Sequence, residues 1–208
     1  MYLYVPDKMA DWEPGYILAE LGSGQYCKQG ISYHLVLCGC DQNPVTTMGG
    51  MVLQPEISIN EINPAAGNLL ILPGSQTWAD PSHIQSIERV KELLKTDLVI
   101  GAICGATMAL AQGGALNNCR HTSNDVMVLK MFCPGYTGES HYLDQPAVTE
   151  GNLITASGLA PVDFAYQVIK RLDVMQEEIL DAWYNLNTTR KPEYYFALMN
   201  YVEKQKSG

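Results

Sequence analysis

The segment Leu98–Leu110 constrains the fold of this chain more than any other. Its first part, Leu98–Ile103, is an uninterrupted apolar run of the length expected for a buried β-strand. The run stops at Cys104, and the small residue Gly105 opens a stretch rich in alanine that favours a tightly turned helix start. A strand that turns sharply into a helix at a potential nucleophile is the sequence form of a nucleophile elbow. The first N–H groups of such a helix lie beside the sulfur and favour negative charge there.

Strands and helices alternate along the rest of the chain. Apolar runs predict strands at 2–5, 32–40, 68–72, 98–103, 147–149 and 153–156, with a small hairpin or edge strands within 46–62. Helical spacing predicts helices over 12–21 with Asp11 as N-cap, over 84–94, 105–112 and 160–172, and twice more at about 175–184 and 192–204. This alternation predicts an α/β fold, a flavodoxin-like three-layer sandwich around a mostly parallel central sheet. The length of 208 residues suits a single domain, with a core over about 1–172 and a C-terminal helical extension over about 174–204.

The composition limits the classes of molecule that this protein can bind. The net charge of −9, from 13 basic and 22 acidic residues without a basic cluster, argues against nucleic acid as a partner. No apolar run approaches the roughly 20 residues that span a bilayer, and no signal peptide precedes the first strand, so we expect a cytoplasmic protein that binds no membrane. Its six cysteines are expected to be reduced there. No group of residues has metal-ligand spacing, and we expect neither a metal nor a cofactor.

Three loops at the strand ends carry the candidate chemistry. Ligands of parallel α/β sheets bind at the carboxyl ends of the strands, where Glu13, the turn at Gly74 and Ser75, and the pair Cys104 and Gly105 should converge. Backbone N–H groups of Gly105 and of the Gly74–Ser75 turn would face developing negative charge. An enclosed Glu13 carboxyl should have a raised pKa and, while protonated, would lower the pKa of the thiol by hydrogen bonding to the thiolate. Alternatively, Glu13 is a first-turn residue favoured by a helix dipole.

The order of four motifs makes the chain resemble the ThiJ/PfpI superfamily of class I glutamine amidotransferase-like proteins. The motifs are Ala-Asp-Trp-Glu at 10–13, Thr-Thr-Met-Gly-Gly with Pro-Glu at 46–56, Leu-Pro-Gly-Ser at 72–75 and Ala-Ile-Cys-Gly-Ala at 102–106. Segments 120–124 and 154–165 also fit, so that the resemblance spans about 1–172. The His-Thr-Ser-Asn sequence at 121–124 is similar to bacterial proteins named glutamine amidotransferases or intracellular proteases and amidases.

The resemblance implies a reactive thiol at Cys104 with the Glu13 carboxyl in contact with it, and it implies a homodimer. We expect the substrate pocket to be formed by residues in or beside the matching segments, namely Trp12, Asn124, Gly158 and Pro161.

The chain departs from the resemblance in its histidines. Class I amidotransferases use a late His-x-Glu pair as base and orienter, but residues 156–161 read Ala-Ser-Gly-Leu-Ala-Pro. Protease-like members place a histidine directly after the cysteine, where this chain has Gly105. Of the remaining histidines, His121 either approaches Cys104 as a proton-transfer residue or serves packing. We expect His34 to lie within a strand and His83 on the surface.

Three functions remain open at this point. The first is a thiol-dependent enzyme of hydrolase or amidase type that acts on a small carbonyl or amide compound. The second is an oxidative-stress sensor or protective protein in which Cys104 is oxidised and does not turn over a substrate. The third is a binding module that keeps the pocket without chemistry. The aromatic tail after 174 either packs on its own domain, covers the site or forms a dimer surface.

Overall fold

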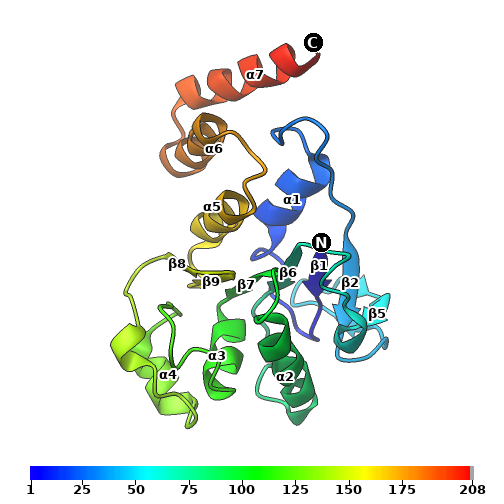
Figure 1. The fold of residues 1–208 in the computed structure, drawn as a ribbon, viewed down its shortest axis with the longest axis vertical. Coiled ribbons are helices and arrows are strands. Elements are labelled where there is room, and N and C mark those ends of the chain that lie inside the picture. Colours follow the sequence, from blue (N-terminus) through cyan, green and yellow to red (C-terminus); the bar gives the residue numbers. More distant parts are fainter. Residues whose placement is uncertain (207–208) are drawn as a thin grey trace.

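The computed structural model describes residues 1–206 and contains a seven-stranded sheet with the strand order β5-β2-β1-β6-β7-β9-β8 (Figure 1). Every neighbouring pair is parallel except β8 and β9, which pair antiparallel. The strands are β1 (Tyr2–Tyr4), β2 (Val36–Gly39), β5 (Ile57–Ser58), β6 (Leu69–Leu72), β7 (Val99–Ile103), β8 (Ala147–Glu150) and β9 (Leu153–Ala156). A separate two-stranded hairpin consists of β3 (Val45–Thr46) and β4 (Val52–Leu53).

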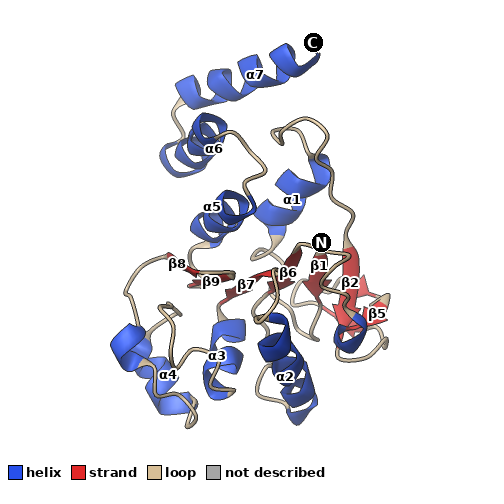
Figure 2. Ribbon diagram, in the orientation of Figure 1, coloured by secondary structure: helices blue, strands red, loops and turns tan. Residues whose placement is uncertain are grey.

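Helices cover both faces of this sheet, as Figure 2 shows. One face carries α1 (Gly15–Ser23) and α5 (Pro161–Leu172), and the other carries α2 (Ile84–Leu93) and α3 (Gly105–Gln112), with α4 (Val126–Phe132) beside α3. Short 3-10 turns occur at Ile59–Glu61, Pro81–His83 and Glu139–His141. The predicted α/β, flavodoxin-like three-layer sandwich with a mostly parallel sheet is therefore confirmed.

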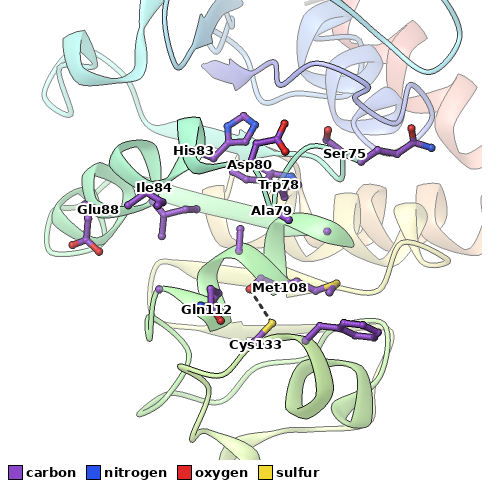
Figure 3. A pocket seen from close by; sticks show the side chains of 16 residues that line it. Ser75, Trp78, Ala79, Asp80, His83, Ile84, Glu88, Met108, Gln112 and Cys133 are labelled. Atoms are coloured by element: carbon purple, nitrogen blue, oxygen red, sulfur yellow. Dashed lines mark hydrogen bonds between the residues drawn. The ribbon is translucent and has the colours of Figure 1, made fainter.

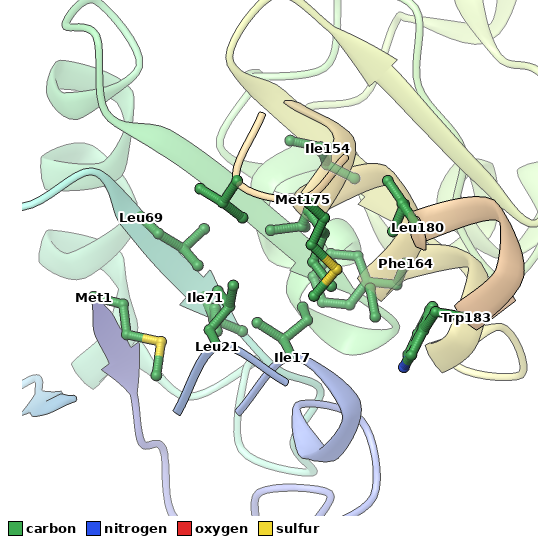
Figure 4. Close-up of a cluster of buried hydrophobic side chains, with 14 of the residues drawn as sticks. Met1, Ile17, Leu21, Leu69, Ile71, Ile154, Phe164, Met175, Leu180 and Trp183 are labelled. Carbon is green, nitrogen blue, oxygen red and sulfur yellow. The ribbon is translucent and has the colours of Figure 1, made fainter. Parts of the chain in front are cut away.

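The sheet separates two apolar cores. The core under α1 and α5 is shown in Figure 4, and its largest fully buried members include Ile17, Leu21 and Phe164. At Gly101 in the middle of β7, a Cβ atom would come within 2.8 Å of the Phe164 ring. The glycine thus lets α5 approach the sheet closely, which fixes the loop before α5 at the end of β9.

The C-terminal extension packs on its own domain. It consists of α6 (Glu177–Thr189), which lies on α5, and α7 (Pro192–Lys206), which lies on α6. Trp183 of α6 is buried and meets the Tyr16 ring of α1 edge to face at 5.9 Å. The Tyr201 hydroxyl of α7 donates a hydrogen bond to the Cys27 carbonyl oxygen. Of the three roles considered for the tail, these contacts support packing on the domain.

Several local predictions need correction. The strand predicted over 32–40 is limited to β2, and His34 is exposed and precedes it. The first helix begins at Gly15 and not at residue 12 or 13. Asp11 does not cap it, because its carboxylate accepts the Gly49 N–H at 2.6 Å and so ties this loop to the β3–β4 hairpin. Helix α4 was not predicted from the sequence.

Candidate active site

Cys104 occupies a strained elbow between β7 and α3. Its backbone angles are φ 58° and ψ −123°, a conformation that costs a non-glycine residue about 1–3 kcal/mol. The conformation is held by hydrogen bonds on both sides: the Cys104 N–H donates to the Ala156 carbonyl at 3.0 Å, and the Cys104 carbonyl accepts from the Thr107 N–H and hydroxyl. The sulfur consequently stands at the beginning of α3, as the nucleophile-elbow pattern predicts.

Glu13 lies against this thiol with its side chain almost fully enclosed, at 1% exposure. Its Oε2 atom accepts the Gly74 N–H at 2.5 Å. Within residues 1–206, Oε1 has no hydrogen-bond partner. The interaction between the Glu13 carboxyl and the Cys104 thiol affects the pKa of both groups. Glu13 precedes α1, whose first turn contains no acidic residue, so the alternative of a dipole-stabilised helical residue does not hold.

Two glycines form the walls of the Cys104–Glu13 contact. A Cβ atom on Gly74 would lie 2.9 Å from Cys104 Cβ and 2.8 Å from Glu13 Oε2. A Cβ atom on Gly158 would lie 2.7 Å from Cys104 Sγ. Real Cβ atoms do not approach other atoms this closely, so both positions require glycine as long as the thiol and the carboxyl stay where they are.

Asn124 completes the immediate surroundings of the sulfur. Its Nδ2 atom donates a hydrogen bond to Cys104 Sγ over 3.4 Å, and its Oδ1 atom accepts the Gly158 N–H at 2.8 Å. The thiol is therefore flanked by a carboxyl on one loop and an amide on another. Both of these residues belong to the set predicted from the sequence.

Burial dominates the electrostatics of the pair. It raises the pKa of Glu13 above its ordinary value of 4.5, as predicted, while the Gly74 N–H and the thiol act in the opposite direction. Burial also raises the pKa of the Cys104 thiol above 9.0, contrary to the predicted lowering. Hydrogen bonds from Asn124 and the Gly105 N–H lower the pKa of the thiol, and an ionised Glu13 raises it. The two groups titrate as a coupled pair because each senses the charge of the other.

The predicted oxyanion donors divide into two kinds. The Gly74 N–H already donates to Glu13, which corrects the expectation that it would face an oxyanion. Gly105 packs against the backbone of Ser75, where a Cβ atom on Gly105 would lie 3.4 Å from the Ser75 nitrogen and 3.1 Å from its carbonyl oxygen. The N–H groups of Gly105 and Ser75 therefore remain candidates for stabilising an oxyanion.

The remaining predicted pocket residues lie at the margin of the site. Trp12 is 56% exposed directly before Glu13 in the chain. Pro161 opens α5, three residues after Gly158, and the intervening Leu159 is almost fully exposed. Within residues 1–206, neither Trp12 nor Pro161 forms a hydrogen bond with the Cys104 thiol.

His121 does not serve as a base for the thiol. It is fully buried, with Nδ1 at 2.8 Å from the Cys119 carbonyl oxygen and Nε2 at 2.8 Å from the Tyr136 hydroxyl. Burial lowers the pKa of its imidazole. Both ring nitrogens are thus engaged in structural hydrogen bonds. His121 therefore serves packing, and the prediction that it transfers the thiol proton is wrong.

His83 is a polar core residue that we predicted to lie on the surface. It is 4% exposed, with Nδ1 at 2.7 Å from the Tyr4 hydroxyl and Nε2 at 3.1 Å from the Thr77 hydroxyl. The Thr77 hydroxyl in turn lies 3.0 Å from that of Ser75. This chain of hydrogen bonds anchors the loop that carries Ser75 to the first strand. The sequence feature that points to a structured position for His83 is the Asp-Pro pair at 80–81, which is typical of a turn before a helix.

A cavity of about 610 Å³ lies beside the elbow, between α2, α3 and the end of α4 (Figure 3). It reaches Ser75 and Gly105, but Cys104 and Glu13 do not line it. The other lining residues include Trp78, Ile84, Met108 and Phe132. The candidate active site is the pair of Cys104 and Glu13 and not this cavity, because a nucleophile in contact with a buried carboxyl is found at that pair.

The structure contains neither a grouped set of metal ligands nor a membrane-spanning helix within residues 1–206. Among residues 1–206, no three side chains of His, Cys, Asp or Glu are grouped to hold a metal ion. Over the same range, none of the helices combines the length and apolar character needed to cross a membrane.

Together, the parallel sheet and the cysteine elbow define the class of this protein: it is a flavodoxin-like α/β protein with a thiol and a buried carboxyl at the carboxyl ends of the strands. Residues 1–171 match the model of the DJ-1/PfpI family, and the chain belongs to that family.

Its relatives agree with this assignment. The chain is 47% identical over 205 residues to the uncharacterized protease YoaZ of Bacillus subtilis, covering 98% of both chains. It is 31% identical to the uncharacterized protease YdeA of the same organism over 87% of both chains. The crystal structure of a thiJ/pfpI family protein from Bacillus anthracis superposes with a TM-score of 0.91 at 46% identity, over 96% of this chain and 94% of that one.

Proposed function

We propose that this protein is a thiol-dependent hydrolase of the amidase type that acts on a small carbonyl or amide compound. The contact between Cys104, at a strained elbow, and the enclosed Glu13 carboxyl carries this proposal. Backbone conformations of this cost cluster at active sites and switch regions, which motivates a functional role for the elbow. The names of the two Bacillus subtilis relatives, both described as uncharacterized proteases, support the same class of reaction.

The proposed reaction begins with a proton transfer. The Glu13 carboxylate takes the proton of the Cys104 thiol, and the thiolate attacks the carbonyl carbon of the substrate. The N–H groups of Gly105 and Ser75 stabilise the oxyanion that forms. Protonated Glu13 then returns the proton to the leaving amine as the C–N bond breaks, which leaves a thioester on Cys104. Glu13 next accepts a proton from the attacking water, and the hydroxide adds to the thioester carbonyl. As the C–S bond breaks and the acid is released, Glu13 returns this proton to the sulfur, which restores the thiol and the carboxylate.

Substitution at the two reacting groups tests this proposal. We would measure turnover of a panel of small amides, glyoxals and isonitriles by wild type, Cys104→Ser, Glu13→Gln and the control Cys119→Ser. Cys119 is a suitable control because its thiol is also half-buried. Within residues 1–206, the hydrogen bond of its sulfur goes to the Ala115 carbonyl oxygen. We expect background turnover in Cys104→Ser and a loss of about 10²-fold or more in Glu13→Gln, with the control unchanged. Equal activity of wild type and Cys104→Ser contradicts the proposal.

The alternative function is a cysteine-based oxidative-stress sensor or protective protein. It is supported by the position of Cys104 at the N-terminus of α3, which distinguishes it from the other half-buried cysteines, Cys40 and Cys119, and from the buried Cys27, Cys38 and Cys133. Mild peroxide treatment followed by peptide mapping separates the two functions. A dedicated sensor oxidises at Cys104 first, and oxidation spread evenly over all six cysteines contradicts it.

We further propose that the protein is a cytoplasmic homodimer with a small-molecule substrate. A reducing compartment keeps Cys104 in the thiol form that the reaction requires. Analytical ultracentrifugation should give twice the chain mass, and a single species of one chain mass at micromolar concentration contradicts the dimer.

A further inference from the structure

We propose that Asn124 is a catalytic residue that donates a hydrogen bond to the Cys104 thiolate and leaves the thiol proton to Glu13. This role rests on the proposed function, because it concerns the same thiol. It assigns the task of stabilising the nucleophile to a neutral amide, which cannot act as a base.

The orientation of the Asn124 amide is set by its oxygen. Oδ1 accepts the Gly158 N–H at 2.8 Å and lies 3.4 Å from the Ser157 hydroxyl, which donates to it. A flipped amide would direct its NH₂ group against the Gly158 N–H, where two donors would face each other. The Nδ2 atom is therefore the end that faces Cys104 Sγ, at 3.4 Å.

This placement is built from two loops that meet at the thiol. Asn124 directly precedes Asp125, whose carboxylate caps α4 by accepting the Met127 N–H at 2.6 Å. Its preceding residue, Ser123, is buried with its hydroxyl 2.7 Å from the Thr107 hydroxyl of α3. The loop after β9 supplies Gly158 from the other side. Asn124 is exposed, but its own side chain bonds Gly158 and its neighbour Ser123 bonds α3, so that both loops place its amide at the thiol.

An amide NH₂ group stabilises a thiolate more than a thiol, because hydrogen bonds to a charged acceptor are the stronger ones. The Asn124 contact accordingly lowers the pKa of Cys104 against the larger effect of burial. Since an amide NH₂ has no free lone pair to take a proton, the proton released from Sγ passes to Glu13 Oε1 and the electron pair stays on sulfur. His121, whose ring nitrogens contact Cys119 and Tyr136, is not available for it.

Two substitutions test this donor: Asn124→Ala removes it without adding a charge, and Asn124→Asp replaces it by a negative charge. Aspartate keeps the oxygen that accepts the Gly158 N–H, so the loop is retained, but it replaces the NH₂ group by a carboxylate oxygen next to the sulfur. The readout is the pH midpoint of Cys104 alkylation by iodoacetamide, followed by mass spectrometry of the Cys104 peptide. We expect the midpoint to rise by about one pH unit in Asn124→Ala and by more in Asn124→Asp. The control Asn187→Asp changes an amide on α6 that bonds the Trp183 carbonyl, and should leave the midpoint unchanged.

Midpoints of Asn124→Ala and Asn124→Asp that coincide with wild type overturn this role. Circular dichroism of each variant confirms that the comparison is made between folded proteins. The alkylation readout does not depend on a substrate. If no substrate of the panel is turned over while the midpoints shift as expected, the proposed function fails and the role of Asn124 at the thiol stands.

Discussion

The buried carboxyl of Glu13 should make the stability of the protein depend on pH. Its pKa in the folded state is raised above the ordinary 4.5, with desolvation as the largest cause. A group of this kind stabilises the fold fully below its unfolded pKa, and this contribution is lost as the pH rises through the folded pKa. Between the two values the folded state binds one proton more than the unfolded state.

The magnitude follows from one proton. In the interval between the two pKa values, the free energy of unfolding falls by up to about 1.4 kcal/mol per pH unit relative to a variant without the titrating group. Glu13→Gln is that variant, because glutamine retains the oxygen that accepts the Gly74 N–H. Both forms should be compared in a Cys104→Ser background, since the thiol is coupled to the carboxyl.

Urea unfolding followed by circular dichroism, repeated from acid to weakly alkaline pH, measures this difference. We expect the Glu13→Gln variant to gain stability relative to its parent as the pH rises, until the difference levels off at the folded pKa of Glu13. The control Asp144→Asn alters an exposed carboxyl outside the helices and should give a curve parallel to that of its parent. A constant difference between Glu13→Gln and its parent over the whole range refutes a raised pKa for Glu13.

Three further substitutions test the packing of the site and its supports. Gly158→Ala would place a Cβ atom 2.7 Å from Cys104 Sγ, so alkylation of Cys104 should slow at least about tenfold, whereas Gly22→Ala, with no atom within 4 Å, should leave it unchanged. Equal alkylation rates would contradict the described wall. Trp183→Ala should cost about 3–5 kcal/mol in urea unfolding because its side chain is buried between α6 and α1, and a loss below about 1 kcal/mol would mean that the extension is not an integral part of the fold. Gly101→Ala should destabilise by about 1–3 kcal/mol through its clash with Phe164, and an unchanged urea midpoint would contradict the close approach of α5.

The sheet was predictable because its central strands are buried on both faces and read as continuous apolar runs. β6 and β7 lie close to their predicted bounds for this reason. The strand predicted over 32–40 is shorter, since apolar residues in its first half pack against the core from a loop. Helix α4 was missed because its sequence, Val-Met-Val-Leu-Lys-Met-Phe, is apolar almost all round, so no alternation of an apolar and a polar face reveals the helical period, although Leu129 is the only one of these side chains that is buried.

The place of the site was predictable, but its protonation was not. The elbow and the strand-end rule predict that Cys104 and Glu13 meet, because backbone topology determines which loops converge at the strand ends, whereas Asn124 was predicted from the family resemblance. The sign of a pKa shift depends on how much each group is desolvated and on which N–H groups point at it. The Gly74 N–H, for example, donates to the Glu13 carboxyl and does not face the position of a substrate oxyanion. Such orientations are set by tertiary packing, as are the hydrogen bonds that engage both nitrogens of His121.

A pH profile of turnover would show which group moves the proton in the proposed reaction. The productive state of the pair has one proton, so the rate should rise through the raised pKa of Glu13 on the acid side and fall above the raised pKa of Cys104, when the acid for the leaving group is gone. Glu13→Gln should remove the limb at the pKa of Glu13, leaving a weak rate that rises only at higher pH, with the formation of the Cys104 thiolate. An acid limb that keeps its wild-type midpoint in Glu13→Gln therefore excludes Glu13 as the proton carrier.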